Sequence, residues 1–175
     1  RIDDLVIRKM ISRCCVNTAE NHLNYPHFVN ISADFLRRPE LIKSIIDYSR
    51  KEFACHGLTE RKHKPLVIEI TEQELLHDIK EVKNLLEPFI EFGCELAIDD
   101  FGSGYSSLTY LADLPIKYLK FDGGLIKRIA YEDRARKIIN GIQKLAESLE
   151  LITIAEHIED QATLDVLREL GVSWG

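Results

Sequence analysis

The sequence lacks several features that would define its class at once. No apolar run approaches the roughly 20 residues of a membrane helix, and no signal-peptide pattern opens the chain. No CxxC pair is present, so the four cysteines are predicted to be core thiols in a reducing compartment rather than disulfides or zinc ligands. Basic residues are outnumbered by acidic ones, 23 against 29, which argues against direct DNA binding. These absences predict a cytoplasmic domain, whose parent protein is free to carry a membrane anchor elsewhere.

The length of 175 residues and the 45% apolar composition suit one well-buried domain over residues 1–175. The chain starts inside an amphipathic helical pattern, and Val172 to Gly175 reads as the opening of another strand. We therefore expect the sequence to be a piece of a larger fold.

Apolar strand candidates alternate with helical stripes along the chain. Nearly continuous apolar runs separated by helices are typical of parallel strands in βαβ units, so the predicted fold class is α/β. The five strand candidates are Phe28 to Ser32, Leu66 to Thr71, Glu95 to Asp100, Ile116 to Asp122 and Leu151 to Glu156. Four helices are predicted between and after these strands. The first begins at Pro39, and the second carries the stripe from Ile79 to Phe89 and ends at Gly93. The third carries the stripe from Ile138 to Leu149, and the fourth runs from a cap at Asp160 to Gly171. The segment from Thr59 to Pro65 is predicted to be a solvated loop without a role in a site.

Polar side chains stand at the end of every strand candidate. The members are Asn30 and Ser32, Glu69 and Glu72, Asp99 and Asp100, Lys120 and Asp122, and Glu156 and Glu159. In a parallel α/β barrel these ends meet at one rim, where active sites are built. These residues also have interpretations without a functional role. Asn30 could bond to neighbouring backbone, and Glu72 could cap a helix. Asp99 and Asp100, followed by Gly102, could form an ordinary strand-to-helix turn. A functional role is favoured for Lys120 within this cluster, because a buried lysine needs a partner such as a carboxylate.

Oxygen ligands without suitably spaced His or Cys select hard cations, here Mg²⁺ or Mn²⁺. Adjacent Asp99 and Asp100 repel each other unless a cation lies nearby, and such a doublet suits two metal ions that activate water against a phosphodiester. The residues therefore predict phosphoester hydrolysis. A magnesium enzyme of the enolase type, with Lys120 as the base, is a weaker alternative because an Asn ligand and an Asp pair suit two metals better.

The same residues resemble the EAL domain, a bacterial family that linearises cyclic di-GMP. The resemblance rests on motifs in family order: Val29 to Ser32, Ile68 to Glu72, Asp99 to Leu108, Leu119 to Asp122 and Ile154 to Glu159. It implies a TIM-like (β/α) barrel of the EAL type, incomplete here because the Glu-Ala-Leu strand and the C-terminal strands and helices are absent from residues 1–175.

The resemblance also implies a role for each site residue. Asn30, Glu69, Asp99, Asp100 and Glu156 match metal-ligand positions. Lys120 matches the lysine that holds the attacking water, Glu72 the glutamate that anchors the loop after Asp100, and Glu159 a supporting carboxylate. The loop from Phe101 to Ser107 resembles the segment that couples substrate, metal and dimer contacts.

This chain departs from the family pattern at a few positions. His157 stands where Gly is usual, Phe35 where Gln is common, and Gly123-Gly124 where Arg-Ser or similar follows the Lys-x-Asp strand. None of these changes removes a metal ligand. His157 and Gly123-Gly124 motivate an alternative function, a catalytically inactive receptor for cyclic di-GMP or a protein-interaction module. The resemblance further implies a homodimer and attached sensory or diguanylate-cyclase-like domains in the parent protein.

Overall fold

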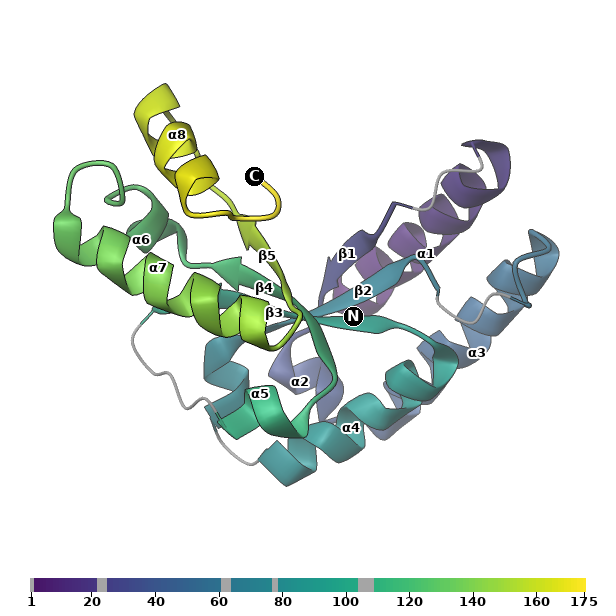
Figure 1. Ribbon diagram of the computed structural model, residues 1–175. Coiled ribbons are helices and arrows are strands. Elements are labelled where there is room, and N and C mark those ends of the chain that lie inside the picture. The colour runs from purple at the N-terminus through teal and green to yellow at the C-terminus, as the bar shows by residue number, and fades with distance from the viewer. Residues whose placement is uncertain (1, 22–24, 61–63, 77–78, 104–108) are drawn as a thin grey trace. The chain divides into compact units, whose positions relative to one another are not determined.

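The computed structural model describes residues 2–21, 25–60, 64–76, 79–103 and 109–175 (Figure 1). It forms two compact units. The first unit contains Arg1–Ile70 and His77–Leu96, and the second contains Thr71–Leu76 and Ala97–Gly175. The strand order is β1-β2-β3-β4-β5.

The first unit is built from long helices and a parallel strand pair. Its elements are α1 (Ile2–Asn21), β1 (His27–Asn30), α2 (Ala33–Leu36), α3 (Pro39–Cys55), β2 (Leu66–Thr71, ending in the second unit) and α4 (Ile79–Phe92). Helices α1 and α3 pack on each other, and Ile7, Ile11 and Ile45 are fully buried. Strands β1 and β2 are parallel, with Asn30 opposite Glu69 at their carboxyl ends.

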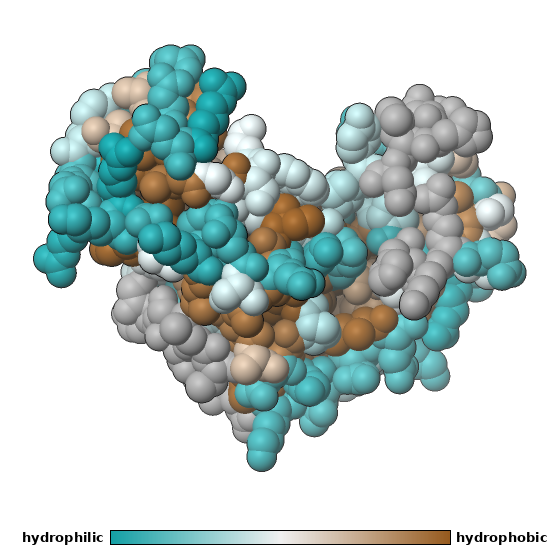
Figure 2. All heavy atoms as spheres, in the orientation of Figure 1, coloured by the Kyte–Doolittle hydropathy of each residue, from teal (hydrophilic) through white to brown (hydrophobic). Residues whose placement is uncertain are grey.

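The second unit carries the remaining strand ends. Its elements are the 3₁₀ helix η1 (Glu72–Leu76), most of β3 (Glu95–Phe101), α5 (Thr109–Asp113), β4 (Ile116–Phe121), α6 (Gly123–Ile126), α7 (Asp133–Ser148), β5 (Ile152–Ala155) and α8 (Gln161–Glu169). Strands β4 and β5 are parallel, and α7 packs against β5 (Figure 1). Their shared core includes Phe121, Ile126, Ile139 and Leu167. Hydrophilic side chains cover much of the visible surface of α7 and α8, as expected for helices with one buried stripe (Figure 2).

All five predicted strands are confirmed, β2 with its predicted bounds and the other four with shifts of at most two residues at an end. The largest shift is in β1, which ends at Asn30 because the Ser32 side chain instead caps α2 by accepting from the Phe35 amide at 3.3 Å. Asp160 caps α8 as predicted, accepting from the Thr163 amide at 2.7 Å. The expected strand opening near the chain end is a parallel bridge between Trp174 and Ile154.

Two predictions about polar and sulfur side chains are wrong. Lys64 belongs to the segment predicted as a solvated loop, yet it is buried, with Nζ donating to the carbonyls of Leu58 and Thr59 at 3.2 and 2.9 Å. Its ammonium also lies 5.2 Å from the ring centre of Phe53, which together with the carbonyls offsets desolvation. Residues 61–63 of this loop lie outside the described residues.

The other error concerns Cys55, which is exposed, whereas Cys14, Cys15 and Cys94 are buried free thiols as expected. Burial is the main factor that raises the pKa of the Cys15 thiol to about 12, so this cysteine is an unreactive core residue. Among the described residues, no helix combines the length and apolar character needed to cross a membrane.

Two glycine positions of the second unit differ in whether they can accept a side chain. Gly102 has φ of 97°, and a Cβ there would lie 2.8 Å from Leu125 Cδ1, whereas a Cβ on Gly141 inside α7 would meet nothing within 4 Å. We expect Gly102→Ala to lower the free energy of unfolding by about 1–2 kcal/mol through left-handed strain. Gly141→Ala, its control, should raise it by about 0.5–1 kcal/mol because Ala favours the helix interior. Urea unfolding followed by circular dichroism measures the free energy of unfolding of both variants. Equal changes in the two variants would contradict the strain expected at Gly102.

Candidate active site

Lys120 is the centre of a charged cluster in the second unit. It is the last but one residue of β4 and is only 6% exposed. Its Nζ lies 3.2 Å from Asp99 Oδ1 and 2.9 Å from Glu156 Oε1. The register of β4 and β5 explains the second contact, because Ile154 is opposite Lys120 and Glu156, two residues further on, points to the same face. Three strand ends thus place one cation and two carboxylates together.

Asp100 adds further negative charge beside this cluster. It follows Asp99 on β3 in a left-handed conformation, with φ of 54°, which Asp tolerates better than most side chains. Desolvation raises its pKa, and the charges of Asp99 and Asp122 raise it further, while Lys120 lowers it. The carboxylates around Asp100 outweigh the ammonium of Lys120, so ionising Asp100 is less favourable in the folded chain than in the unfolded chain.

This raised pKa gives a pH-dependent prediction for Asp100→Asn. The wild-type side chain favours the folded state below its ordinary pKa of 3.8, and this contribution is lost as pH rises through the raised value. In the presence of chelator, the variant should melt at a higher temperature than the wild type at neutral pH. The difference should vanish below the ordinary pKa. Thermal scans across this range measure it, and a constant difference at all pH values would contradict the electrostatic cause.

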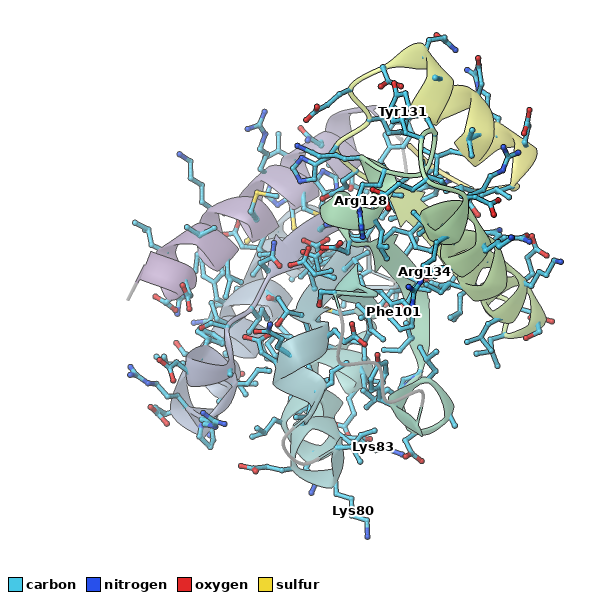
Figure 3. All side chains as sticks on the ribbon, turned by 90° about the vertical axis from the view of Figure 1, so that its left-hand side faces the viewer. Lys80, Lys83, Phe101, Arg128, Tyr131 and Arg134 are labelled. Carbon is cyan, nitrogen blue, oxygen red and sulfur yellow. The ribbon has the colours of Figure 1, made fainter. Side chains whose placement is uncertain are left out.

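Glu72 ties the segment after β3 to η1. It is fully buried, and its two carboxylate oxygens accept from the Gly102 amide at 3.0 Å and from the Tyr110 hydroxyl at 2.8 Å. Burial and the bond to Glu72 raise the pKa of Tyr110. Phe101, labelled at the end of β3 in Figure 3, packs edge to face on the Tyr110 ring. These contacts hold both ends of the segment whose residues 104–108, including most of the predicted coupling loop, lie outside the described residues.

Glu159, Asn30 and Glu69 are the other predicted site residues. Glu159 is exposed and pairs with Lys127 at 2.6 Å rather than with Lys120. Asn30 and Glu69 belong to the first unit, where they are opposite each other in β1 and β2 and Glu69 is buried. Sequence reasoning did not anticipate Tyr110, because a tyrosine on a short helix gives no periodic signal that marks it as the partner of a distant glutamate.

The donor chemistry of the second unit suits a hard divalent cation. Asp99, Asp100 and Glu156 offer only oxygen atoms, and their mutual repulsion would be relieved by added positive charge. No three His, Cys, Asp or Glu side chains within the described part of the chain form a ready-made ion site. In the structure, Lys120 supplies the positive charge between Asp99 and Glu156.

Comparison with known proteins identifies the family. The model of the EAL domain matches residues 1–175, and the chain therefore belongs to the EAL domain family. It is 34% identical over 169 residues to the cyclic di-GMP phosphodiesterase NbdA of Pseudomonas aeruginosa, a match that covers 97% of this chain and 21% of NbdA. It is 35% identical over 150 residues to the bifunctional diguanylate cyclase/cyclic di-GMP phosphodiesterase MucR of the same organism, covering 86% of this chain and 21% of MucR.

A solved structure supports the same assignment. The c-di-GMP complex of the PaMucR phosphodiesterase matches with a TM-score of 0.83 and 30% identity, covering 98% of this chain and 67% of that chain. This likeness confirms the predicted fold class, an α/β TIM-like barrel of the EAL type that is incomplete in this chain. The chain spans about a fifth of the length of NbdA and MucR.

Proposed function

We propose that this domain is a metal-dependent phosphodiesterase that hydrolyses cyclic di-GMP to linear pGpG in bacterial second-messenger signalling. The single observation that supports this most strongly is the buried Lys120 held between Asp99 and Glu156. It is supported further by the membership of the chain in the EAL domain family and by relatives that are named cyclic di-GMP phosphodiesterases.

The proposed ligand set is Asn30, Glu69, Asp99, Asp100 and Glu156, for two Mg²⁺ or Mn²⁺ ions. When bound, these ions supply positive charge that activates water and stabilises negative charge on the phosphate. The remaining steps belong to side chains of this chain. Lys120 orients the attacking water, and its ammonium stabilises the negative charge that develops as the water loses its proton.

The water attacks phosphorus in line with the leaving 3′ oxygen, so that one P–O bond forms while the bond to the 3′ oxygen breaks. The leaving oxygen gains a proton, which balances the proton lost by the water. Glu72 acts at a distance from this chemistry by fixing the Gly102 amide, and so the backbone after Asp100. Glu159, which pairs with Lys127, is proposed to support the site through that ion pair.

The parent protein is proposed to be a homodimer with further sensory or diguanylate-cyclase-like domains. MucR, whose printed name joins cyclase and phosphodiesterase activities, is consistent with such attachments because this chain covers only 21% of it. We propose a cytoplasmic location on the basis of the four free cysteines, which suit a reducing compartment.

The proposal is tested by incubating the full-length protein with cyclic di-GMP in magnesium, in manganese and in chelator, with products separated by chromatography. Metal-dependent appearance of pGpG is the expected result. Binding of cyclic di-GMP without product in either metal would overturn the enzyme and favour the receptor alternative, which His157 and Gly123-Gly124 motivate. Neither binding nor product would favour a protein-interaction module.

A further inference from the structure

His157 directly follows Glu156 and has an unusual backbone conformation. Its φ is 58°, in the left-handed region that disfavours side chains other than Gly, Asn and Asp, although His is also enriched there. The residue is exposed at the end of β5, next to the carboxylate that pairs with Lys120. Non-glycine residues in this region cluster at functional sites, where the strain is retained for a purpose.

The imidazole of His157 fills the space above Gly123. A Cβ built on Gly123 would overlap Cδ2 of His157 and would lie 3.1 Å from its Cγ. Gly123 is the first residue of α6, directly after Asp122 at the end of β4. A side chain at position 123 and the present ring at position 157 therefore exclude each other. Gly123 and His157 both depart from the family pattern, and the absence of a side chain at position 123 is what leaves room for the ring at position 157.

The ring is also available to a ligand. Across the described residues, neither ring nitrogen of His157 takes part in a hydrogen bond or ion pair. Two residues after Gly123 have partners other than His157: Arg128 Nε donates to the Gly124 carbonyl at 3.0 Å, and the Tyr131 hydroxyl donates to Asp160 at 2.7 Å. The imidazole thus presents an aromatic face and two nitrogen atoms at the edge that carries Lys120 and Glu156.

We propose that His157 is a specificity-determining residue whose imidazole contacts the bound dinucleotide, in the space that Gly123 leaves open. This inference rests on the proposed function, because the ligand is the dinucleotide that this site is proposed to bind. A base or a phosphate oxygen of cyclic di-GMP would meet the ring by stacking or by a hydrogen bond.

The test measures cyclic di-GMP affinity by calorimetry in chelator, together with KM and kcat in manganese, for variants of the full-length protein. His157→Gly should weaken the affinity and raise KM about tenfold, which corresponds to about 1.4 kcal/mol of contact energy. Its kcat should stay within about twofold, since no reacting group is removed. Its melting temperature should be no lower than that of the wild type, because Gly adopts a positive φ without strain.

Gly123→Ala supplies the matched second variant. The added methyl group should push the ring away and weaken the affinity in the wild-type background, but should have no effect when His157→Gly is already present. Gly141→Ala, in the open part of α7, is the control and should bind normally. Normal affinity of His157→Gly, or an equal effect of Gly123→Ala in both backgrounds, would overturn the inference.

The outcomes separate this inference from the proposed function. A wild-type protein that binds cyclic di-GMP without forming pGpG removes the enzymatic proposal, while the affinities of the variants still decide the role of His157. A wild-type protein that forms pGpG and a His157→Gly variant that binds normally overturn only the present inference. A wild type that neither binds cyclic di-GMP nor forms pGpG overturns both.

Discussion

Replacing Lys120 with Met is expected to lower kcat for cyclic di-GMP by about 10²–10⁴-fold, the usual contribution of a group that assists proton transfer. The physical reason is that this ammonium is the only cation paired with Asp99 and Glu156 in the described part of the chain. Met retains the length of the side chain but cannot stabilise charge on the attacking water. Turnover by the full-length protein in saturating manganese measures the effect.

The same strand offers a matched control for this prediction. Lys117 lies three residues earlier on β4 and is exposed, so Lys117→Met removes an equal charge without touching the cluster. It should leave kcat unchanged. In chelator, Lys120→Met should also unfold at lower denaturant concentration than Lys117→Met, because it removes the cation that pairs with the part-buried Asp99. A Lys120→Met protein with normal kcat would exclude the proposed role of the lysine.

Replacing Asp99 with Asn should abolish metal-dependent turnover and should reduce the rise in melting temperature that manganese produces in the wild type. Asn keeps the shape but loses the charge, and a neutral amide is a much poorer ligand for a hard divalent cation than a carboxylate. Lys120 keeps Glu156 as a partner at 2.9 Å, so the fold should survive the change. The assay for pGpG and thermal scans with and without manganese provide independent readouts.

The exposed Asp113 at the end of α5 is the control for this substitution. Asp113→Asn removes the same charge from the same unit and should leave both the turnover and the response to manganese as in the wild type. If Asp99→Asn hydrolyses cyclic di-GMP normally, the proposed mechanism fails. If it loses turnover yet keeps the full manganese shift, Asp99 acts on the substrate rather than on the metal.

Local signals allowed much of the fold to be predicted from the sequence. Apolar runs located the five strands, because a strand covered on both faces must be apolar throughout. Pro39 and Asp160 marked helix starts, since a residue in the first turn or at the cap acts on its own few neighbours. Strand ends were placed less accurately, as at β1, because a cap such as Ser32 competes with the ladder for the same residues.

The candidate site was predictable only as a set of residue types at strand ends. Polar residues at the ends of the predicted strands indicated that Asp99, Lys120 and Glu156 share one rim, and the structure shows that Lys120 contacts both carboxylates. The burial of Lys64 was missed because its partners are carbonyls and ring faces, which leave no charge pattern in the sequence.

By itself, the sequence determined the fold class, because the alternation of apolar strands and helical stripes depends on local periodicity. Its motifs and their order, which resemble those of the EAL domain, indicated the family. Tertiary structure alone decided which side chains meet: Glu72 with Tyr110 across 38 positions, and Gly123 with the ring of His157. Such pairs depend on how strand ends and helix starts approach one another in space, and the distance between two residues along a chain does not specify that approach.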